Sequence, residues 1–400
     1  MRIKLVIFSV FLATFGISIG EIVVNDYLSF KGFIDLSYSY IDESIDPSGA
    51  SNYDETDRSS EVEEVEVSLL FEFAPVSAQI DIEYEDRRGS NLQVEQAFVA
   101  YRHEGQMQSS TITAGRYASM LGFEAYKPTG LYQYSNAYGG ILTELFGTAL
   151  ITNGSFTPPT IDSDASVFIE SLIFSLGDRY SQGLRYSFEN DRSFFGFSIQ
   201  DGTISYKNRT GGDDDADNTA VDDDGYGFEV AYVYDFGFGV KYFLGGSYET
   251  GDGINTRTAT MGDTETYIIN TYVTCELGAW LFAVELNYSE SEIEDAFAIV
   301  SDTEIESITG LLMTNYAYSE RSSVTGRISY TDLDGDTNAS GGAAIDGKQF
   351  KYTIAHNYAF SDNLFLVAEL SYVDGEFDSS LGEEGDLDEF LAAAELIFTF

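Results

Sequence analysis

Histidines are the first residues to examine for catalysis, and the 400-residue chain has two, His103 and His356. A serine nucleophile needs such a base within hydrogen-bond reach of its hydroxyl group. His356 alternates with Ile354 and Tyr358, so we expect it to share their apolar face. The chain carries no helical zinc motif, phosphate loop or dinucleotide fingerprint. The sequence therefore predicts no enzyme, and an enzymatic activity stays the alternative.

Acidic runs are the second candidate for chemistry, because Ca²⁺ and Mg²⁺ prefer carboxylate oxygens. One expected loop contains Asp213, Asp214, Asp215 and Asp217. A later run from Asp332 begins like a calcium-binding loop but has Ala343 where that motif requires a glutamate. We expect solvated loops, with a weak metal site at Asp213–Asp217 as the alternative and no other cofactor.

Composition narrows the class of protein. The chain has 20 Lys and Arg against 67 Asp and Glu, a net charge of −47, which excludes nucleic acid as a partner. Disorder is excluded because 44% of the residues are hydrophobic and 15% aromatic. The single cysteine, Cys275, excludes an internal disulfide. Abundant Tyr and Phe with only 5 Pro favour many strands joined by short turns.

The first twenty residues have the pattern of a secretory signal peptide. Arg2 and Lys4 precede an apolar run that ends near Ile17, and small residues follow at Ser18 and Gly20. The apolar run is shorter than the roughly 20 residues that a membrane-spanning helix needs. We therefore expect a signal peptide at 1–20 and a mature chain at 21–400.

Alternation of apolar and polar residues dominates the rest of the chain, and a period of two indicates strands. At the C-terminus, Phe390, Phe398 and Phe400 share one face, while Glu395 and Thr399 share the other. Sixteen such segments begin near residues 28, 61, 77, 91, 108, 181, 192, 226, 239, 264, 280, 304, 322, 348, 363 and 387.

The connections between these segments are of two kinds. Tight turns follow the even segments, as at Ala74-Pro75 and Ser361-Asp362-Asn363. Long polar loops follow most odd segments, at about 42–60, 118–180, 202–224, 250–263, 290–303, 332–347 and 374–386. Short turns at one end and long loops at the other are typical of a transmembrane β-barrel, which must close because lipid offers no partner for free strand edges.

The predicted fold is thus an all-β, antiparallel transmembrane barrel of sixteen strands, with short periplasmic turns and long extracellular loops. An eighteen-stranded barrel is the alternative if segments 141–152 and 165–176 pair. A soluble β-sandwich would also alternate, but here the strands end in aromatic residues, as the interfacial girdles of a membrane barrel do.

These features resemble the outer-membrane porins of Gram-negative bacteria. The resemblance rests on Phe30-Lys31-Gly32-Phe33-Ile34-Asp35, on Gly115-Arg116-Tyr117 and on the terminal Glu395-Leu396-Ile397-Phe398-Thr399-Phe400. The region from Gly115 to Gly140 is also similar to OmpL-like porins. The chain lacks the Pro-Glu-Phe-Gly-Gly sequence of general porins, and only Tyr138-Gly139-Gly140 is comparable, which leaves the constriction residues open.

The resemblance implies an outer-membrane diffusion channel for small hydrophilic solutes, usually a homotrimer. It implies that the connection at about 118–180, after the fifth strand, folds into the lumen. It also implies that Phe400 is the assembly signal read by the barrel-assembly machinery. Further expected partners are outer-membrane lipid and lipopolysaccharide, and divalent bridging of the acidic loops to lipopolysaccharide is the alternative to solvated loops.

Alternation also assigns side chains to the lumen. More acids than bases face inward, which predicts cation selectivity, and we expect Arg185, Arg327 and Lys351 to form a basic strip across from Glu124 in the infolded loop. A substrate-specific channel, an adhesin and a barrel enzyme are the alternatives. The expected pore-lining residues are Lys31, Asp35, Glu64, Glu66, Glu72, Asp81, Glu83, Glu85, Arg185, Glu229, Lys241, Glu249, Glu285, Arg327, Lys351, Glu369 and Glu395.

Overall fold

A computed structural model describes most of the chain after the predicted signal peptide. The described residues are 20–48, 52–85, 91–124, 127–138, 140–143, 145, 180–201, 225–252, 263–294, 302–337, 344–380 and 384–400. Among them no helix is long and apolar enough to cross a membrane.

The described residues form seventeen strands, one short 3₁₀ helix, η1 (Pro128–Gly130), and a helical segment at Ile141–Thr143. The strands are β1 (Ile22–Val23), β2 (Leu28–Pro47), β3 (Tyr53–Phe73), β4 (Val76–Glu85), β5 (Asn91–Glu104), β6 (Gln108–Ala118), β7 (Tyr180–Asn190), β8 (Ser193–Gln200), β9 (Tyr226–Asp235), β10 (Val240–Asp252), β11 (Asp263–Leu277), β12 (Trp280–Ile293), β13 (Thr303–Ser319), β14 (Ser322–Thr337), β15 (Ala344–Ser361), β16 (Leu364–Ser379) and β17 (Glu384–Thr399).

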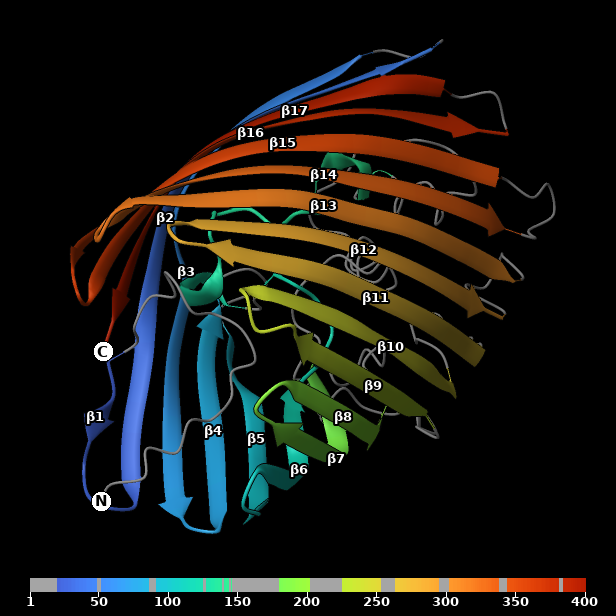
Figure 1. The fold of residues 1–400 in the computed structure, drawn as a ribbon. Helices are drawn as coiled ribbons and strands as arrows, with labels where there is room; N and C mark the ends of the chain where they lie inside the picture. The colour runs from blue at the N-terminus through green and yellow to red at the C-terminus, as the bar shows by residue number, and fades with distance from the viewer. Residues whose placement is uncertain are drawn as a thin grey trace.

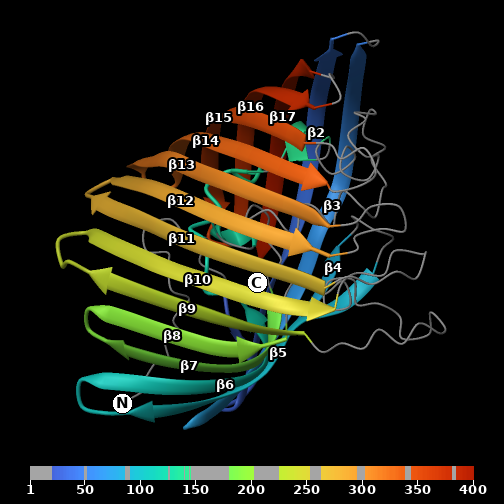
Figure 2. The same cartoon turned by 90° about the vertical axis from the view of Figure 1, so that its right-hand side faces the viewer.

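Strands β2 to β17 form a closed barrel (Figures 1 and 2). Each pairs antiparallel with the next, and β17 pairs with β2 from Gly385↔Pro47 to Thr399↔Phe33. The two-residue β1 lies beside β2 as an addition to the ring. The prediction of a sixteen-stranded antiparallel barrel is confirmed. The eighteen-strand alternative required segments 141–152 and 165–176 to pair as strands. Ile141–Thr143 are helical instead, and 165–176 lie outside the described residues.

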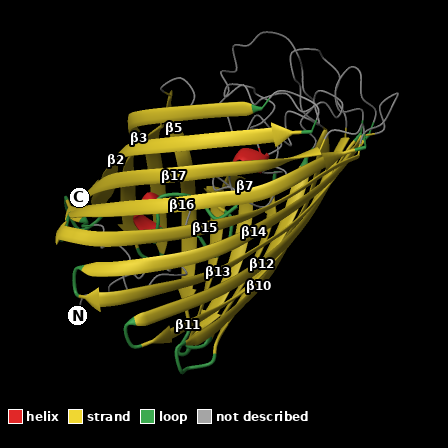
Figure 3. Ribbon diagram, turned by 90° about the horizontal axis from the view of Figure 1, so that it is seen from above, coloured by secondary structure: helices red, strands yellow, loops and turns green. Residues whose placement is uncertain are grey.

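The predicted tight turns are present, including those between β3 and β4 and between β15 and β16, and Figure 3 shows such turns at one end of the wall. The predicted bounds of three long loops, 42–60, 332–347 and 374–386, are wrong. The strands run further than expected, β2 to Pro47, β14 to Thr337 and β16 to Ser379. Both faces of a strand that projects beyond the bilayer are wet. Its sequence therefore loses the alternation by which strands are recognised.

The wall has an apolar outer face and a largely polar inner face. On β12 the outward Phe282, Val284 and Leu286 are exposed, whereas the inward Glu285 and Asn287 are buried. Outward aromatic rings pack together near the turn end, where the rings of Trp280 and Tyr316 stack with centroids 4.3 Å apart. An exposed apolar surface of this kind is stable in lipid.

Acidic side chains occupy the outer face nearer the loops. Glu304 of β13 lies directly opposite Asp336 of β14, and Glu306 lies opposite Asp334. Asp346 of β15 continues this row beside Asp334. Like charges opposite each other destabilise a sheet, and water with salt screens such repulsion. These ends of the strands therefore project past the apolar band into solvent.

Phe400 sits where the barrel closes. The backbone N–H of Phe400 donates to Gly32 O at 3.0 Å, and Gly32 N–H donates to Phe400 O at 2.9 Å. The Phe400 ring packs where a Gly32 side chain would lie, since a Cβ there would meet the ring at 2.6 Å. Its centroid is 6.5 Å from that of Phe30. The last residue thus completes the pairing of the first and last barrel strands.

We expect Phe400→Asp to reduce the yield of folded protein in the outer membrane sharply, because a charge replaces the ring that packs on Gly32 at the seam. The measurement is the folded fraction in outer-membrane preparations. Phe360→Asp is the matched control, since Phe360 is exposed at the same end of the barrel, on β15 and away from the seam. Equal yields of the two variants would contradict the assignment.

Candidate functional site: the infolded loop

The connection after β6, the fifth strand of the ring, enters the barrel. Its first segment, 119–124, runs along the inner wall, which Figure 2 shows as a teal trace inside the strands. Met120 N–H donates to Glu229 at 2.7 Å, Gly122 N–H to Asn270 at 2.9 Å and Phe123 N–H to Glu285 at 2.8 Å. The backbone N–H groups of this segment have no neighbouring strand to pair with, and wall carboxylates and an amide accept their hydrogen bonds instead.

The second segment, 131–138 and 140–142, lies over β12 to β17. Tyr134 and Ser135 donate their backbone N–H groups to Glu369 at 2.8 and 3.0 Å. Ile141 N–H donates to Glu389 at 3.2 Å. Hydrogen bonds to ionised acceptors are roughly twice as strong as neutral ones. The acidic wall therefore acts as a receptor for the loop backbone.

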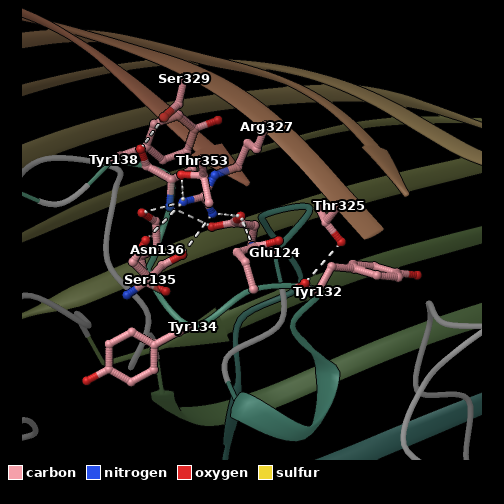
Figure 4. Close-up of polar contacts among 12 residues, drawn as sticks. Glu124, Tyr132, Tyr134, Ser135, Asn136, Tyr138, Thr325, Arg327, Ser329 and Thr353 are labelled. Atoms are coloured by element: carbon pink, nitrogen blue, oxygen red, sulfur yellow. Dashed lines mark hydrogen bonds and ion pairs between the residues drawn. The ribbon is translucent and has the colours of Figure 1, made fainter. Parts of the chain in front are cut away.

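Arg327 of β14 binds the carbonyl side of the same loop (Figure 4). Its guanidinium group donates to Glu124 Oε1 at 2.5 Å, to Ser135 O at 2.9 Å and to Asn136 O at 3.0 Å. The side chain has no exposed area, and Thr353 accepts a further bond at 3.3 Å. The planar fork of an arginine suits this convergent set of oxygens.

Lys127 fastens the loop to the other side of the barrel. Its ammonium group is ion-paired with Glu66 of β3, and lies 2.6 Å from Glu95 of β5 and 3.7 Å from Asp81 of β4. The three carboxylates are buried within 4.8 Å of one another. Three acids this close repel one another strongly unless a cation lies among them, and here the cation is the loop's own lysine.

Apolar contacts complete the seat of the loop. Leu121 packs in a cluster with Phe243 and Tyr272 of the wall, and Tyr138 packs with Leu281 and Met313. The inner face therefore also carries apolar side chains where the loop lies on it, whereas alternation alone predicted a polar inner face. Burial raises the pKa of the Tyr138 phenol well above its usual range, so the phenol stays protonated and donates to Glu285 at 2.8 Å.

The structure places the residues expected in the lumen on the inner face, and their role as pore-lining groups stays a prediction. Lys31, Glu64, Glu72, Arg185 and Lys241 are partly buried. The side chain of Glu85 and the whole of Asp213–Asp217 lie outside the described residues. The fully buried members are Asp35, Glu66, Asp81, Glu83, Glu229, Glu249, Glu285, Arg327, Lys351, Glu369 and Glu395.

The expected basic strip is wrong. Arg327 and Lys351 lie on neighbouring strands, but Arg185 is on β7, stacked over Tyr117 at 4.0 Å and 4.0 Å from Glu229. Arg327 does not face Glu124 across a gap, because the two side chains are in contact. Of the charges expected to produce a transverse field, Arg327 and Glu124 instead hold the loop.

Sequence reasoning missed Glu63 and Glu95, which are both buried and both contact the loop. Each is the extra residue of a β-bulge, where the register shifts and adjacent side chains turn inward. The signal was available, because Glu63-Glu64 and Glu95-Gln96 each break the alternation with two polar residues in a row. Lys127 and Glu389 carried no comparable signal.

The two histidines lie away from the infolded loop. His356 is on the outer face of β15, where its Nε2 is 2.7 Å from the Tyr318 hydroxyl oxygen and the two rings stack. His103 is exposed near the end of β5.

The sequence profile of a family described as "Putative beta-barrel porin-2, OmpL-like" matches residues 161–400. The chain belongs to this family. It is a porin-like barrel channel of the Gram-negative outer membrane. The matched residues begin after the Gly115–Gly140 region on which the similarity to OmpL-like porins first rested. No curated protein sequence matches the chain.

Solved structures show the same fold at low identity. OmpT of Vibrio cholerae, folded in vitro, is 14% identical with a TM-score of 0.55, covering 95% of this chain and 100% of its own. An anion-selective porin of Comamonas acidovorans is 13% identical with a TM-score of 0.54, covering 93% and 99%. The channel DcaP of Acinetobacter baumannii is 11% identical with a TM-score of 0.51, covering 93% and 97%.

We expect Arg327→Met to destabilise the barrel by about 3–5 kcal/mol, because it removes the cation paired with the partly buried Glu124 carboxylate and the guanidinium donor of the Ser135 and Asn136 carbonyls. Unfolding in urea, followed by tryptophan fluorescence, measures the change. Arg321→Met is the control, since Arg321 is an exposed residue at the turn before the same strand. An unfolding free energy equal to that of the control would show that Arg327 does not hold the loop.

Proposed function

We propose that the protein is a cation-selective diffusion channel for small hydrophilic solutes, narrowed by the infolded loop. The observation that carries this proposal is the fastening of the loop inside a closed sixteen-stranded barrel by wall residues on both sides. A barrel of sixteen strands encloses more space than its wall side chains fill. A loop held against the wall narrows that space without requiring a packed core.

The charge of the interior supports cation selectivity. Among the described residues, twelve acidic side chains are buried but only two basic ones, Arg327 and Lys351. Fixed negative charge in a narrow aqueous path concentrates cations and repels anions. The fold alone does not determine the sign, since a structural neighbour is described as anion-selective.

A channel fits the site better than an enzyme does. The buried acids accept hydrogen bonds from the loop backbone, and His356 pairs with Tyr318 on the outer face. Neither histidine lies beside the loop. A substrate-specific channel is the second candidate, because the aromatic side chains Tyr132, Tyr134 and Tyr138 from one loop segment pack inside the barrel.

The partners are proposals as well. A trimeric form of the Vibrio cholerae OmpT has been solved, which supports a homotrimer here, and the migration of unheated protein on a semi-native gel tests it. Outer-membrane lipid and lipopolysaccharide would contact the outer face, and the barrel-assembly machinery would read Phe400. A weak Ca²⁺ or Mg²⁺ site at Asp213–Asp217 stays a prediction.

We expect a reversal potential of cation-selective sign in a KCl gradient across a planar bilayer. The selectivity should be strong near 0.1 M salt, where the Debye length is about 10 Å, and weak near 1 M, where it is about 3 Å. Replacing Glu64, Glu66 and Glu72 by neutral residues should shift the potential toward zero. Because Glu66 is ion-paired with Lys127, a second variant with Glu64→Gln and Glu83→Gln tests the inner-wall charge while leaving that ion pair in place.

The control for that measurement replaces Asp213, Asp214, Asp215 and Asp217 by asparagine. These carboxylates lie in an expected extracellular loop, so their removal should shift the potential less. An anion-selective potential in the unmodified protein would overturn the proposal, and an equal shift in both variants would contradict the assignment of the selectivity to the inner wall alone.

A further inference from the structure

Two anchors fasten the infolded loop to opposite parts of the barrel. Glu124 is bound to Arg327 on β14, and Lys127 is bound among Glu66, Asp81 and Glu95 on β3 to β5. In the closed ring, five strands lie between β14 and β4 in one direction and nine in the other. The two anchors therefore hold the loop between nearly facing walls.

The length of the chain limits how far apart these anchors can be. Glu124 and Lys127 are three residues apart, and three fully extended residues span at most about 10 Å. The rest of the distance between the walls must be bridged by the Glu124, Arg327 and Lys127 side chains. Glu124 and Lys127 consequently tie nearly facing parts of the wall to one short stretch of chain, so we expect a change at either anchor to act on the width of the passage.

Lys127 also changes the charge of the wall. Without its ammonium group, Glu66, Asp81 and Glu95 would present three carboxylates at one point of the inner face. With the ammonium group in place, the cluster holds one positive charge among three carboxylates, and the Lys127 side chain lies against all three. The Lys127 side chain is also more exposed than its three partners. It keeps 19% of its solvent-accessible area, whereas each of the three carboxylate side chains keeps 5% or less.

We propose that Lys127 is a specificity-determining residue of the channel, because its ammonium group both holds the loop against β3–β5 and masks the Glu66, Asp81 and Glu95 carboxylates from permeating cations. The proposal rests on the channel function inferred above. Removal of the ammonium group releases one anchor, which widens the passage, and uncovers a cluster of carboxylates that attracts cations.

The experiment measures single-channel conductance and the K⁺ to Cl⁻ permeability ratio for Lys127→Met in planar bilayers at 0.1 M KCl, where the Debye length is about 10 Å. We expect both quantities to rise severalfold over those of the unmodified channel. Lys127→Arg retains a cation among the carboxylates and should stay close to the unmodified channel. Lys348→Met is the charge-matched control, because Lys348 is exposed on the outer face of β15.

A second variant separates the two effects of Lys127. Adding Glu66→Gln, Asp81→Asn and Glu95→Gln to Lys127→Met removes the uncovered charge but leaves the anchor broken. The conductance should then stay high while the permeability ratio falls to the unmodified value or below it. If Lys127→Met does not assemble, Lys127→Gln keeps a hydrogen-bond donor without the charge, and the permeability ratio should still rise.

The outcomes distinguish this proposal from the channel function itself. An unmodified protein that does not conduct, or that selects anions, overturns the channel proposal on which this one depends. An unmodified channel that is cation-selective, together with a Lys127→Met variant of the same conductance and permeability ratio, overturns the role of Lys127 alone. A rise in both quantities that Lys348→Met reproduces would also overturn it.

Discussion

The backbone of the infolded loop must find hydrogen-bond partners inside a barrel whose own strands are already paired. Nearly every feature of the interior follows from this requirement. Glu229, Glu285, Glu369 and Glu389 lie on four different strands and accept backbone N–H groups of the loop. Arg327 supplies the complementary donors for the loop carbonyls. A buried polar group left unpaired would cost about 1–3 kcal/mol, so these side chains determine where the loop lies.

The acidic side chains of this protein lie in two different parts of the structure. Inside, carboxylates bind the loop and give the inner face its negative charge. Outside, carboxylates such as Glu304 and Asp336 oppose one another on strand ends that project past the apolar band. The first group is buried and specific, whereas the second is solvated and screened by salt. A single value of net charge therefore combines two populations with different roles.

Holding the loop and conducting ions make opposite demands on the same carboxylates. An acid that accepts a loop N–H, or that pairs with Lys127, has less of its charge directed at a passing ion. Selectivity then depends on the acids left facing the aqueous path and on the ammonium group that covers three others. The bulges at Glu63 and Glu95 serve this arrangement, because each adds an inward carboxylate beside the loop.

The sequence by itself determined the wall of this protein. Period-two alternation showed sixteen segments, their inward and outward faces and the tight turns, because lipid outside and water inside impose opposite preferences on successive residues. Alternation failed where that contrast was absent, on strand ends such as Ile45–Pro47 and at the bulged Glu63 and Glu95. Only the tertiary structure decided which carboxylates meet the loop and that Lys127 lies among Glu66, Asp81 and Glu95. These contacts join residues up to about 250 positions apart, and the alternation of one strand contains no information about the loop that will cover it.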